Sequence, residues 1–516
     1  MNNAIEIRQD NLYSAKINSD SRFTPEDKTG DIAEKALEIQ RRFADEFRNA
    51  ANGKGRLHLK KVLRGWTLPW IDLEIPEGTV ISDPLDKDGK LADQNKNIQE
   101  VIRVAGKVRA EKTEVWVNLG IGGSDLTTQA LVWSTINSRH NSLPKEDRGG
   151  APEIYFIGND FSPEKVSDLL ESLHQRNLLT KTKFNVISKS GGTQETLAAF
   201  LITREFLIKK LNLKPGEAGK FFVATTGMND KSLLFQLNKR EPFYAMLPVP
   251  DGTGGRFSAF SPVGLLALAV TANEKLGESP KSRVYDAMKG IKDAISGMLD
   301  QPADSPENAV FQSAMNQVIA EIRKKKTFLI MIVYDPLLKQ VGELAQQLYS
   351  ESVQKFAQGM DFVSIVGSEK MHSIWNGAAE GTGAMRDLVL FVGSKKTDPK
   401  RDPVIPKGSG IAGKEVESME GLTLSKVQQA SMEGVMRDAT ERGILNYAIM
   451  IPERSVREVS RLIYLFQSIV AAEGKLRGLE KEQFADGTYK DFTYLQDGVE
   501  GYKIQTREIL QKLKGV

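Results

Sequence analysis

The chain has no cysteine, few histidines, no long apolar run and almost no excess charge of either sign. Because cysteine is absent, disulfide bonds, thiolate catalysis and cysteine-ligated metals are excluded, and a reducing compartment suits the composition. The four histidines are His58, His140, His174 and His372, and no two of them have the spacing of metal ligands. We therefore expect no metal site.

The balance of charge excludes the simplest electrostatic functions. Seventy basic and 67 acidic side chains leave a formal net charge of +3, which favours neither nucleic acid nor an anionic membrane as a partner. The longest apolar stretch, residues 263–272, is far shorter than the roughly 20 residues of a spanning helix. Residues 1–8 lack the pattern of a secretory signal. We expect a soluble, cytoplasmic protein.

The length of 516 residues favours at least two hydrophobic cores. The first hundred residues are predicted to be helical, since apolar residues recur at spacings of three and four until Gly53. From about residue 112, short apolar runs alternate with helical stretches, which is typical of a parallel sheet covered on both faces. The predicted strands are 115–119, 154–157, 184–187 and 221–224 in a first block, and 328–333, 362–366, 388–392 and 447–451 in a second.

The fold class expected from this alternation is α/β, with two doubly wound parallel-sheet domains, a helical N-terminal segment and a helical C-terminal tail. An amphipathic helix is predicted over 455–472, a join over 279–306 and a long surface excursion over 393–425. The predicted limits are 1–105 for the N-terminal segment, 106–290 and 291–475 for the two domains, and 476–516 for the C-terminal arm and helix.

A phosphate-binding loop is predicted directly after the run 184–187. Hydroxyls, a lysine and two glycines precede a helical stretch, so that backbone N–H groups and the helix dipole would favour a phosphate dianion. A serine-rich helix cap is the alternative interpretation. The residues are Ser188, Lys189, Ser190, Gly191, Gly192 and Thr193.

A second loop, Gly120 to Ser124, follows the first predicted strand. Open parallel sheets bind ligands beyond the carboxyl ends of their strands, although the loop is equally consistent with a tight turn. Its glycines lack the spacing of a dinucleotide-binding loop, and no acidic residue ends the next strand. A dehydrogenase is therefore disfavoured.

Four further candidates are weak when taken singly. Arg256 follows Gly254 and Gly255, which allow a close approach of the backbone. Its guanidinium is a permanent cation and suits a developing oxyanion, although glycine-rich turns with arginine are common on surfaces. Gln347 and Glu351 share a helix face, where a glutamate is usually just solvated. The other two candidates are His372, which could equally be structural, and the segment Gln496 to Lys503, which could be an exposed helix start.

Taken together and in order, these segments resemble the phosphoglucose isomerase family of the full-length type with two sugar-isomerase (SIS) domains. The resemblance runs from Gly120 to Lys503, about 390 residues. It rests on Gly254-Gly255-Arg256-Phe257-Ser258, on Gln496-Asp497-Gly498-Val499-Glu500 with Lys503, and on the Ser188 loop continued by Gln194-Glu195-Thr196.

The resemblance implies an aldose–ketose isomerase of sugar phosphates, working as a homodimer with shared active sites and without a cofactor. It implies that Glu351 is the base, that Arg256 faces the enediolate, and that His372, from the partner subunit, and Lys503 serve ring opening. The substrate-binding residues that it implies are Gly123, Ser124, Ser188, Lys189, Ser190, Thr193, Gln347 and Gln496.

The chain departs from the family pattern at several positions. Ser190 stands where the family usually has threonine, Gly191 and Gly192 replace bulkier residues, and Met371 stands where glutamine is common. Val353 and Gln354, and also Thr253 and Leu495, break the strict motifs. Two rival hypotheses are another SIS-type isomerase, for aminosugar or mannose phosphates, and a sugar-phosphate sensor that does no chemistry.

Overall fold

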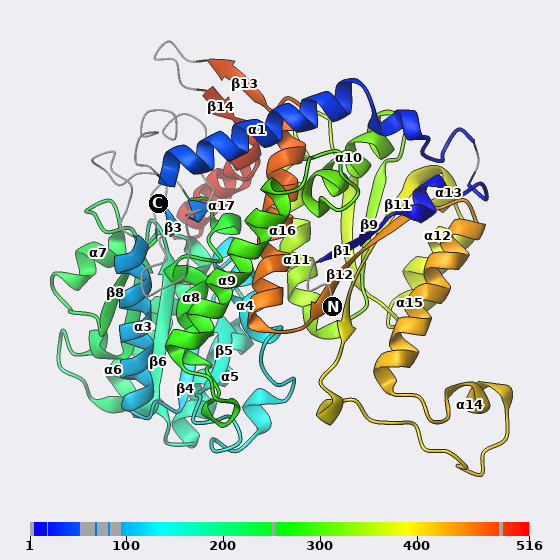
Figure 1. The fold of residues 1–516 in the computed structure, drawn as a ribbon. Coiled ribbons are helices and arrows are strands. Elements are labelled where there is room, and N and C mark those ends of the chain that lie inside the picture. Colours follow the sequence, from blue (N-terminus) through cyan, green and yellow to red (C-terminus); the bar gives the residue numbers. More distant parts are fainter. Residues whose placement is uncertain are drawn as a thin grey trace.

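The computed structural model describes residues 5–17, 19–51, 68–69, 81–82, 94–249, 253–483 and 489–514. It contains two five-stranded sheets, one on each side of a layer of central helices (Figure 1). We call the part built on the first sheet the first domain and the part built on the second sheet the second domain. The α/β fold with two parallel-sheet domains and helical end segments is confirmed.

The first sheet is wholly parallel, in the order β5-β4-β6-β7-β8. Its central strands are buried on both faces, which is why their sequences are continuous apolar runs. The strands are β4 (Val115–Leu119), β5 (Glu153–Ile157), β6 (Thr182–Ser188), β7 (Phe222–Thr226) and β8 (Ala245–Pro248). Four of them match predicted strands, whereas β8 was not predicted.

Helices cover both faces of this sheet. One face packs on α5 (Pro163–Gln175) and α6 (Gln194–Leu211), and α7 (Leu233–Asn238) flanks the same core. The other face packs on the central layer, formed in the first domain by α3 (Gln94–Ala110), α4 (Gly123–Trp133), α8 (Pro262–Val270) and α9 (Pro280–Leu299).

The second sheet has the order β1-β12-β11-β9-β10. Its four parallel strands are those predicted, and a short N-terminal strand, β1, pairs antiparallel with β12 at one edge. The strands are β1 (Glu6–Arg8), β9 (Phe328–Val333), β10 (Asp361–Val366), β11 (Asp387–Lys396) and β12 (Leu445–Glu453).

The two faces of the second sheet belong to different cores. Side chains such as Leu390 and Ile449 face the central layer, whereas Phe391 and Met450 face the helix over residues 424–441, α15. On the central side lie α1 (Asp31–Ala51), α10 (Ala309–Ile322), α11 (Lys339–Ser352) and α16 (Val456–Leu476); on the other side lie α12 (Asn376–Glu380) and α15 (Leu424–Glu441). The shorter elements are α13 (Gly383–Arg386), α14 (Lys414–Met419), and the strand pairs β2 (Leu68–Pro69) with β3 (Ile81–Ser82) and β13 (Glu480–Gln483) with β14 (Tyr489–Asp491).

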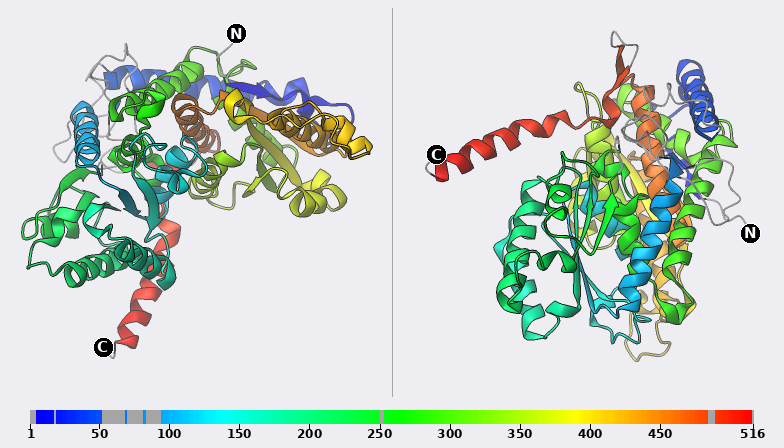
Figure 2. Two further views of the ribbon diagram at one scale, coloured as in Figure 1. Left: turned by 90° about the horizontal axis from the view of Figure 1, so that it is seen from below. Right: turned by 90° about the vertical axis from the view of Figure 1, so that its left-hand side faces the viewer.

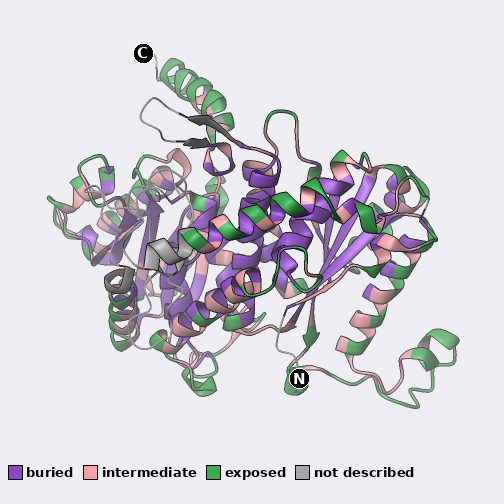
Figure 3. Ribbon diagram, turned by 45° about the horizontal axis from the view of Figure 1, so that its top comes forward, coloured by how far each residue is buried: buried purple, intermediate pink, exposed green. Residues whose placement is uncertain are grey.

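One continuous core joins the domains, because the same cluster of buried side chains includes residues of both sheets. The predicted join over 279–306 is the helix α9, which packs along α16 rather than acting as a linker. The helix α16, predicted as amphipathic, is buried along nearly its whole length (Figure 3). The domain limits stay predictions, and the limit at 290 falls inside α9.

The last helix, α17 (Glu500–Leu513), differs from the rest because it projects away from the body of the protein (Figure 2). None of its residues is buried. The predicted surface excursion is mostly exposed and carries α14. No helix in the described part of the chain combines the length and the apolarity needed to span a membrane.

Candidate active site

An arginine from the first domain contacts a glutamate from the second. Arg256 lies in a 3-10 turn, Gly255–Phe257, and Glu351 lies in the last turn of α11. The Nη1 of Arg256 donates to Oε2 of Glu351 at 2.9 Å. The arginine side chain is 2% exposed and the glutamate side chain 21%, so the carboxylate retains access to solvent while its cationic partner is enclosed.

Burial lowers the pKa of Arg256, and the charge of Glu351 raises it. The guanidinium nevertheless stays protonated, because its ordinary pKa lies so far above neutrality. The site therefore contains a permanent, fixed positive charge beside a carboxylate.

Gln347 fixes the other oxygen of the same carboxylate. It lies one turn before Glu351 on α11, and its Nε2 donates to Oε1 at 2.9 Å. The predicted sharing of a helix face is thus confirmed. With one donor on each oxygen, the Glu351 carboxylate has a defined orientation.

The guanidinium of Arg256 has further acceptors that the sequence did not indicate. Its Nε donates to Oγ of Ser352 at 2.7 Å, and its Nη2 donates to the backbone oxygen of Thr493 at 2.7 Å and, more weakly, to that of Leu495 at 3.4 Å. On the other side of the turn, Nε2 of Gln467 donates to the backbone oxygen of Arg256 at 3.3 Å. Arg256 is therefore held by α11, by α16 and by the C-terminal segment.

The loop after β4 packs directly against the arginine turn. Gly123 begins α4, and a Cβ added there would lie 2.0 Å from the carbonyl carbon of Gly255 and 2.2 Å from the nitrogen of Arg256. The neighbouring Gly122 has a positive φ of 58° and lies against the side-chain amide of Gln347. Only glycine fits this close approach of two backbones.

The predicted phosphate loop lies at the carboxyl end of β6. Thr193 is the N-cap residue of α6, yet its hydroxyl does not cap that helix and lies 3.1 Å from Oγ of Ser188. The first N–H groups of an uncapped helix have no partner within the helix and favour an anion. Ser190 and Gly192 are exposed next to them.

The backbone of this loop is fixed by the segment that follows β7. Gly227 donates to the backbone oxygen of Lys189 at 2.9 Å, and Leu233 donates to that of Ser190 at 3.0 Å. Gly191 has a φ of 68°, and a Cβ there would lie 2.8 Å from the nitrogen of Leu234. The two glycines that depart from the family pattern thus belong to a tight, well-fixed turn.

The two loops predicted to bind the ligand are neighbours, because β4 and β6 are adjacent parallel strands. Gly120, at the end of β4, lies against Ile187 of β6 and Ser124 of α4. One chain therefore brings most of the predicted site residues to the carboxyl edge of the first sheet, next to the end of α11. They are Gly123, Ser124, Arg256, Gln347 and Glu351, with Ser188 to Thr193 on the adjacent strand.

Three predicted residues are placed differently. His372 is exposed in a π-helical turn, Met371–Trp375, that follows the edge strand β10. Gln496 is exposed, one residue after the Leu495 carbonyl that accepts from Arg256. Lys503 lies on the projecting α17, where its Nζ contacts Oε1 of Glu500 at 2.8 Å. No contact within the described chain joins His372 or Lys503 to Glu351.

In the described residues, no three histidine and acidic side chains gather in a way that would hold a metal ion. Asp251 and Gly252, which precede Thr253 and the two glycines before Arg256 in the sequence, lie outside the described residues.

Comparison with known proteins places the chain in a family. The family model described as phosphoglucose isomerase matches residues 80–380. A glucose-6-phosphate isomerase of Pediococcus pentosaceus is 32% identical over 413 residues, covering 80% of this chain and 86% of the relative. A glucose-6-phosphate isomerase of Clostridioides difficile is 30% identical over 464 residues, covering 89% of this chain and 93% of that relative.

Solved structures share the fold over almost the whole chain. A hypothetical protein from Thermus thermophilus superposes with a TM-score of 0.68 at 22% identity, covering 98% of this chain and 99% of that one. A glucose-6-phosphate isomerase from Chlamydia trachomatis superposes with a TM-score of 0.67 at 19% identity, covering 93% of this chain and 86% of that one. The matched family model and the similarity to these relatives establish that this chain belongs to the phosphoglucose isomerase family.

Proposed function

We propose that this protein interconverts glucose 6-phosphate and fructose 6-phosphate through a cis-enediolate. The observation that supports this most directly is the 2.9 Å contact between Arg256 and Glu351, next to two loops suited to a sugar phosphate. Relatives over 80% or more of the chain carry the name of that enzyme.

Phosphate binding orients the substrate in this proposal. The Ser188 and Thr193 hydroxyls and the first N–H groups of α6 hold the dianion, with Lys189 and Ser190 beside them. The loop at Gly123 and Ser124 lines the sugar. Binding energy from this remote group fixes the position of the reacting carbons.

Glu351 transfers the proton in this proposal. It takes the proton from C2 of the aldose and returns it to C1, since both carbons of the planar enediolate present the same face to it. Such general base catalysis typically contributes ~10²–10⁴-fold. Arg256 lies beside the carboxylate and stabilises the oxyanion as it forms, an interaction of a kind worth roughly 3–4 kcal/mol of barrier.

Ring opening requires an acid and a base, and among the described residues no contact brings His372 or Lys503 to Glu351 within one chain. We assign this step to His372 of the partner subunit, which reaches the site in a homodimer, and to Lys503. Gln496 steadies the ligand next to Arg256. The projecting α17 supports a dimer, because a helix exposed on all sides leaves apolar residues in water; these are Tyr502, Ile504, Ile509, Leu510 and Leu513.

No nucleic acid, membrane or cofactor enters this reaction, and the cysteine-free composition suits the cytoplasmic location that we propose. Proton transfer between neighbouring carbons needs no redox group, because the oxidation of C2 is balanced by the reduction of C1.

The test is Glu351→Gln. Glutamine keeps an oxygen to accept from Arg256 and occupies the same volume, but it cannot accept the C2 proton. We expect kcat for fructose 6-phosphate in a coupled assay to fall by at least ~10²-fold, with unchanged binding of inorganic phosphate. The matched control is Glu417→Gln, an exposed glutamate of α14, which should leave kcat unchanged. Turnover within tenfold of the parent would remove Glu351 as the base.

The same assay separates the rival substrates. Glucose 6-phosphate should be the product. Mannose 6-phosphate formed at a higher rate, or glucosamine 6-phosphate formed when ammonia is supplied as the nitrogen source, would identify a different enzyme of the same fold. A sensor would bind the sugar phosphate and show no turnover at any enzyme concentration.

Subunit mixing tests the shared site. If Glu351 and the partner's His372 complete one site, a mixture of Glu351→Gln and His372→Ala subunits contains hybrid dimers with one intact site each. Random mixing should then restore about a quarter of the parent activity, because half of the dimers are hybrids. If both residues came from the same chain, mixing would restore nothing.

A further inference from the structure

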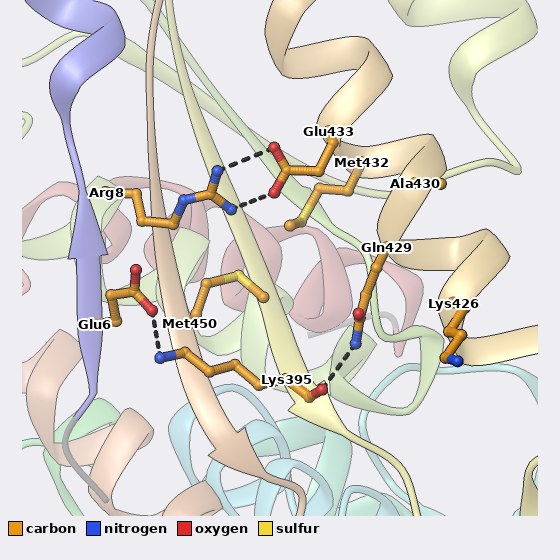
Figure 4. Close-up of a pocket in the computed structure, with 9 residues that line it drawn as sticks. All are labelled: Glu6, Arg8, Lys395, Lys426, Gln429, Ala430, Met432, Glu433 and Met450. Carbon is orange, nitrogen blue, oxygen red and sulfur yellow. Dashed lines mark hydrogen bonds and ion pairs between the residues drawn. The ribbon is translucent and has the colours of Figure 1, made fainter. Parts of the chain in front are cut away.

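A cavity lies on the second domain, between α15 and the edge of the second sheet that β1 forms (Figure 4). It has a volume of about 520 Å³, within the ~300–1,000 Å³ typical of small-molecule sites. Its walls come from β1, the end of β11, β12 and α15. We call it the α15 groove.

The α15 groove and the candidate active site lie on opposite faces of the second sheet. Met432 and Met450, which line the groove, belong to the core cluster under α15, whereas the buried residues of α11 belong to the central core. None of the predicted site residues lines the groove. A ligand here would be additional to the sugar phosphate.

Three polar contacts join β1, β11 and α15, the elements that form the walls of the groove. Arg8 of β1 forms a two-pronged ion pair with Glu433 of α15, with Nη2 and Oε2 2.9 Å apart. At the other end, Nε2 of Gln429 donates to the backbone oxygen of Lys395 at 2.8 Å. The ammonium of Lys395 pairs in turn with Glu6 of β1. These bridges fix the distance between the helix and the sheet edge (Figure 4).

The floor of the groove is apolar and adaptable. The side chains of Met432 and Met450 form it, and both residues are almost fully buried. Gly393 of β11 leaves room for the two thioethers, since a Cβ there would lie 3.2 Å from Cε of Met450 and 3.5 Å from Sδ of Met432. Methionine side chains suit flat or irregular apolar ligands, because they are flexible and polarisable.

Three cationic and two acidic side chains line the groove. Both carboxylates are used, since Glu433 is paired with Arg8 and Glu6 with Lys395. Lys426 also lines the groove and is exposed, and within the described ranges its ammonium has no ion pair. Asp402 accepts hydrogen bonds from the backbone and hydroxyl of Ser425, which lower its pKa together with a smaller effect of the Lys426 charge; it does not line the groove. The net charge at the groove is therefore positive.

We infer that the α15 groove binds a small organic anion, with its apolar body on the Met432–Met450 floor and its anionic group at Lys426. Paired carboxylates at both ends disfavour a cation, and the thioether floor disfavours a fully polar ligand such as free phosphate. The ligand class is an aromatic or branched apolar body that carries one sulfonate, carboxylate or phosphate.

A pair of fluorescent probes tests both halves of this inference. 8-Anilinonaphthalene-1-sulfonate has the required anion, and N-phenyl-1-naphthylamine has the same rings without it. In the full-length protein, Lys426→Met should weaken the binding of the sulfonate probe about tenfold, because such a loss corresponds to one hydrogen bond to a charged group. It should leave the neutral probe and the basal isomerase rate unchanged. The matched control is Lys414→Met, an exposed lysine of α14, which should change neither probe.

Methyl signals locate the probe. With the 14 methionines labelled at their methyl carbon, the sulfonate should shift the signals of Met432 and Met450, which Met432→Leu and Met450→Leu identify. Shifts at these two positions that disappear in Lys426→Met establish the site. Equal sulfonate binding by the parent and by Lys426→Met, or no shift of either methionine at saturating probe, overturns the inference.

Discussion

The substitution Gly123→Ala isolates the contact between the loop after β4 and the turn that carries Arg256. Gly123 begins α4 and does not have a positive φ, so alanine could adopt its backbone conformation without strain. Alanine is also the better helix former by about 1 kcal/mol. On local grounds alone the substitution should stabilise the protein. The contact with the arginine turn predicts the opposite.

The magnitude follows from the distances. The added Cβ would lie 2.0 Å from the backbone of Gly255 and 2.2 Å from that of Arg256, so the turn must retreat by more than 1 Å to reach ordinary contact. Overpacking of this kind costs roughly 1–3 kcal/mol of stability. A displacement of about 1 Å at a reacting group costs on the order of 10²-fold in rate. The displaced group would be the guanidinium that contacts Glu351.

Thermal unfolding and the coupled isomerase assay, run on the same preparations, measure the two effects. The matched control is Gly106→Ala in α3, where nothing lies within 4 Å of the added Cβ; it should raise the melting temperature and leave kcat unchanged. Gly123→Ala should lower both the melting temperature and kcat. If Gly123→Ala behaved like Gly106→Ala, the close approach of the two backbones, and with it the geometry around Arg256, would be refuted.

Two further predictions use other parts of the molecule. Ser188→Ala combined with Thr193→Ala should raise KM by about tenfold or more per hydroxyl, because each hydroxyl would lose hydrogen bonds to a charged group. The value of kcat should change much less. A fall in kcat with an unchanged KM would contradict the phosphate assignment. Burial lowers the pKa of His140 to about 4 in the folded protein, against about 6.5 when unfolded. The unfolded state therefore binds more protons between these values, and stability present above pH 6.5 is lost as pH falls towards 4, by up to about 3 kcal/mol. His140→Gln should flatten that part of the profile of melting temperature against pH, and a profile parallel to the parent's would contradict it.

The sequence predicted the inner strands of both sheets well because parallel strands buried on both faces are continuous apolar runs. The predicted strands at 115–119 and 328–333 have the bounds of β4 and β9. The strand β8 was missed because it is short, lies at an edge and ends in Pro248, a residue that edge strands tolerate. The strand β1 has only three residues, two of them charged, and pairs with β12 across more than 400 residues of sequence.

The helix α16 shows a different limit of the sequence. It was predicted as amphipathic over 455–472, yet it is buried along nearly its whole length. Just beyond the predicted range, charged side chains are buried and paired with one another. Arg477 contacts Glu473 at 2.7 Å, and both side chains have no exposed area. Composition shows that a residue is charged and does not show that its partner lies one turn away inside the core.

The candidate site, like the fold, was predictable from the sequence only in part. Side chains that could carry the chemistry were predicted from their types and order, and the shared helix face of Gln347 and Glu351 from helical spacing; the contacts among Arg256, Gln347 and Glu351 agree with that order. The groups that hold Arg256 were not found, because backbone oxygens of Thr493 and Leu495 have no signal in a sequence. Ser352 had a weak signal, since it adjoins Glu351, but a serine at the end of a helix has many uses.

The anchoring of Arg256 to Thr493 and Leu495 has a consequence for folding. These acceptors lie 237 and 239 residues after Arg256 in the sequence, beyond the last strand of both five-stranded sheets. Until that segment docks, the guanidinium lacks part of its hydrogen-bonded support, however well both sheets have formed. A folding intermediate with both sheets formed and this segment undocked therefore has the loop after β6 in place without a fixed guanidinium beside Glu351.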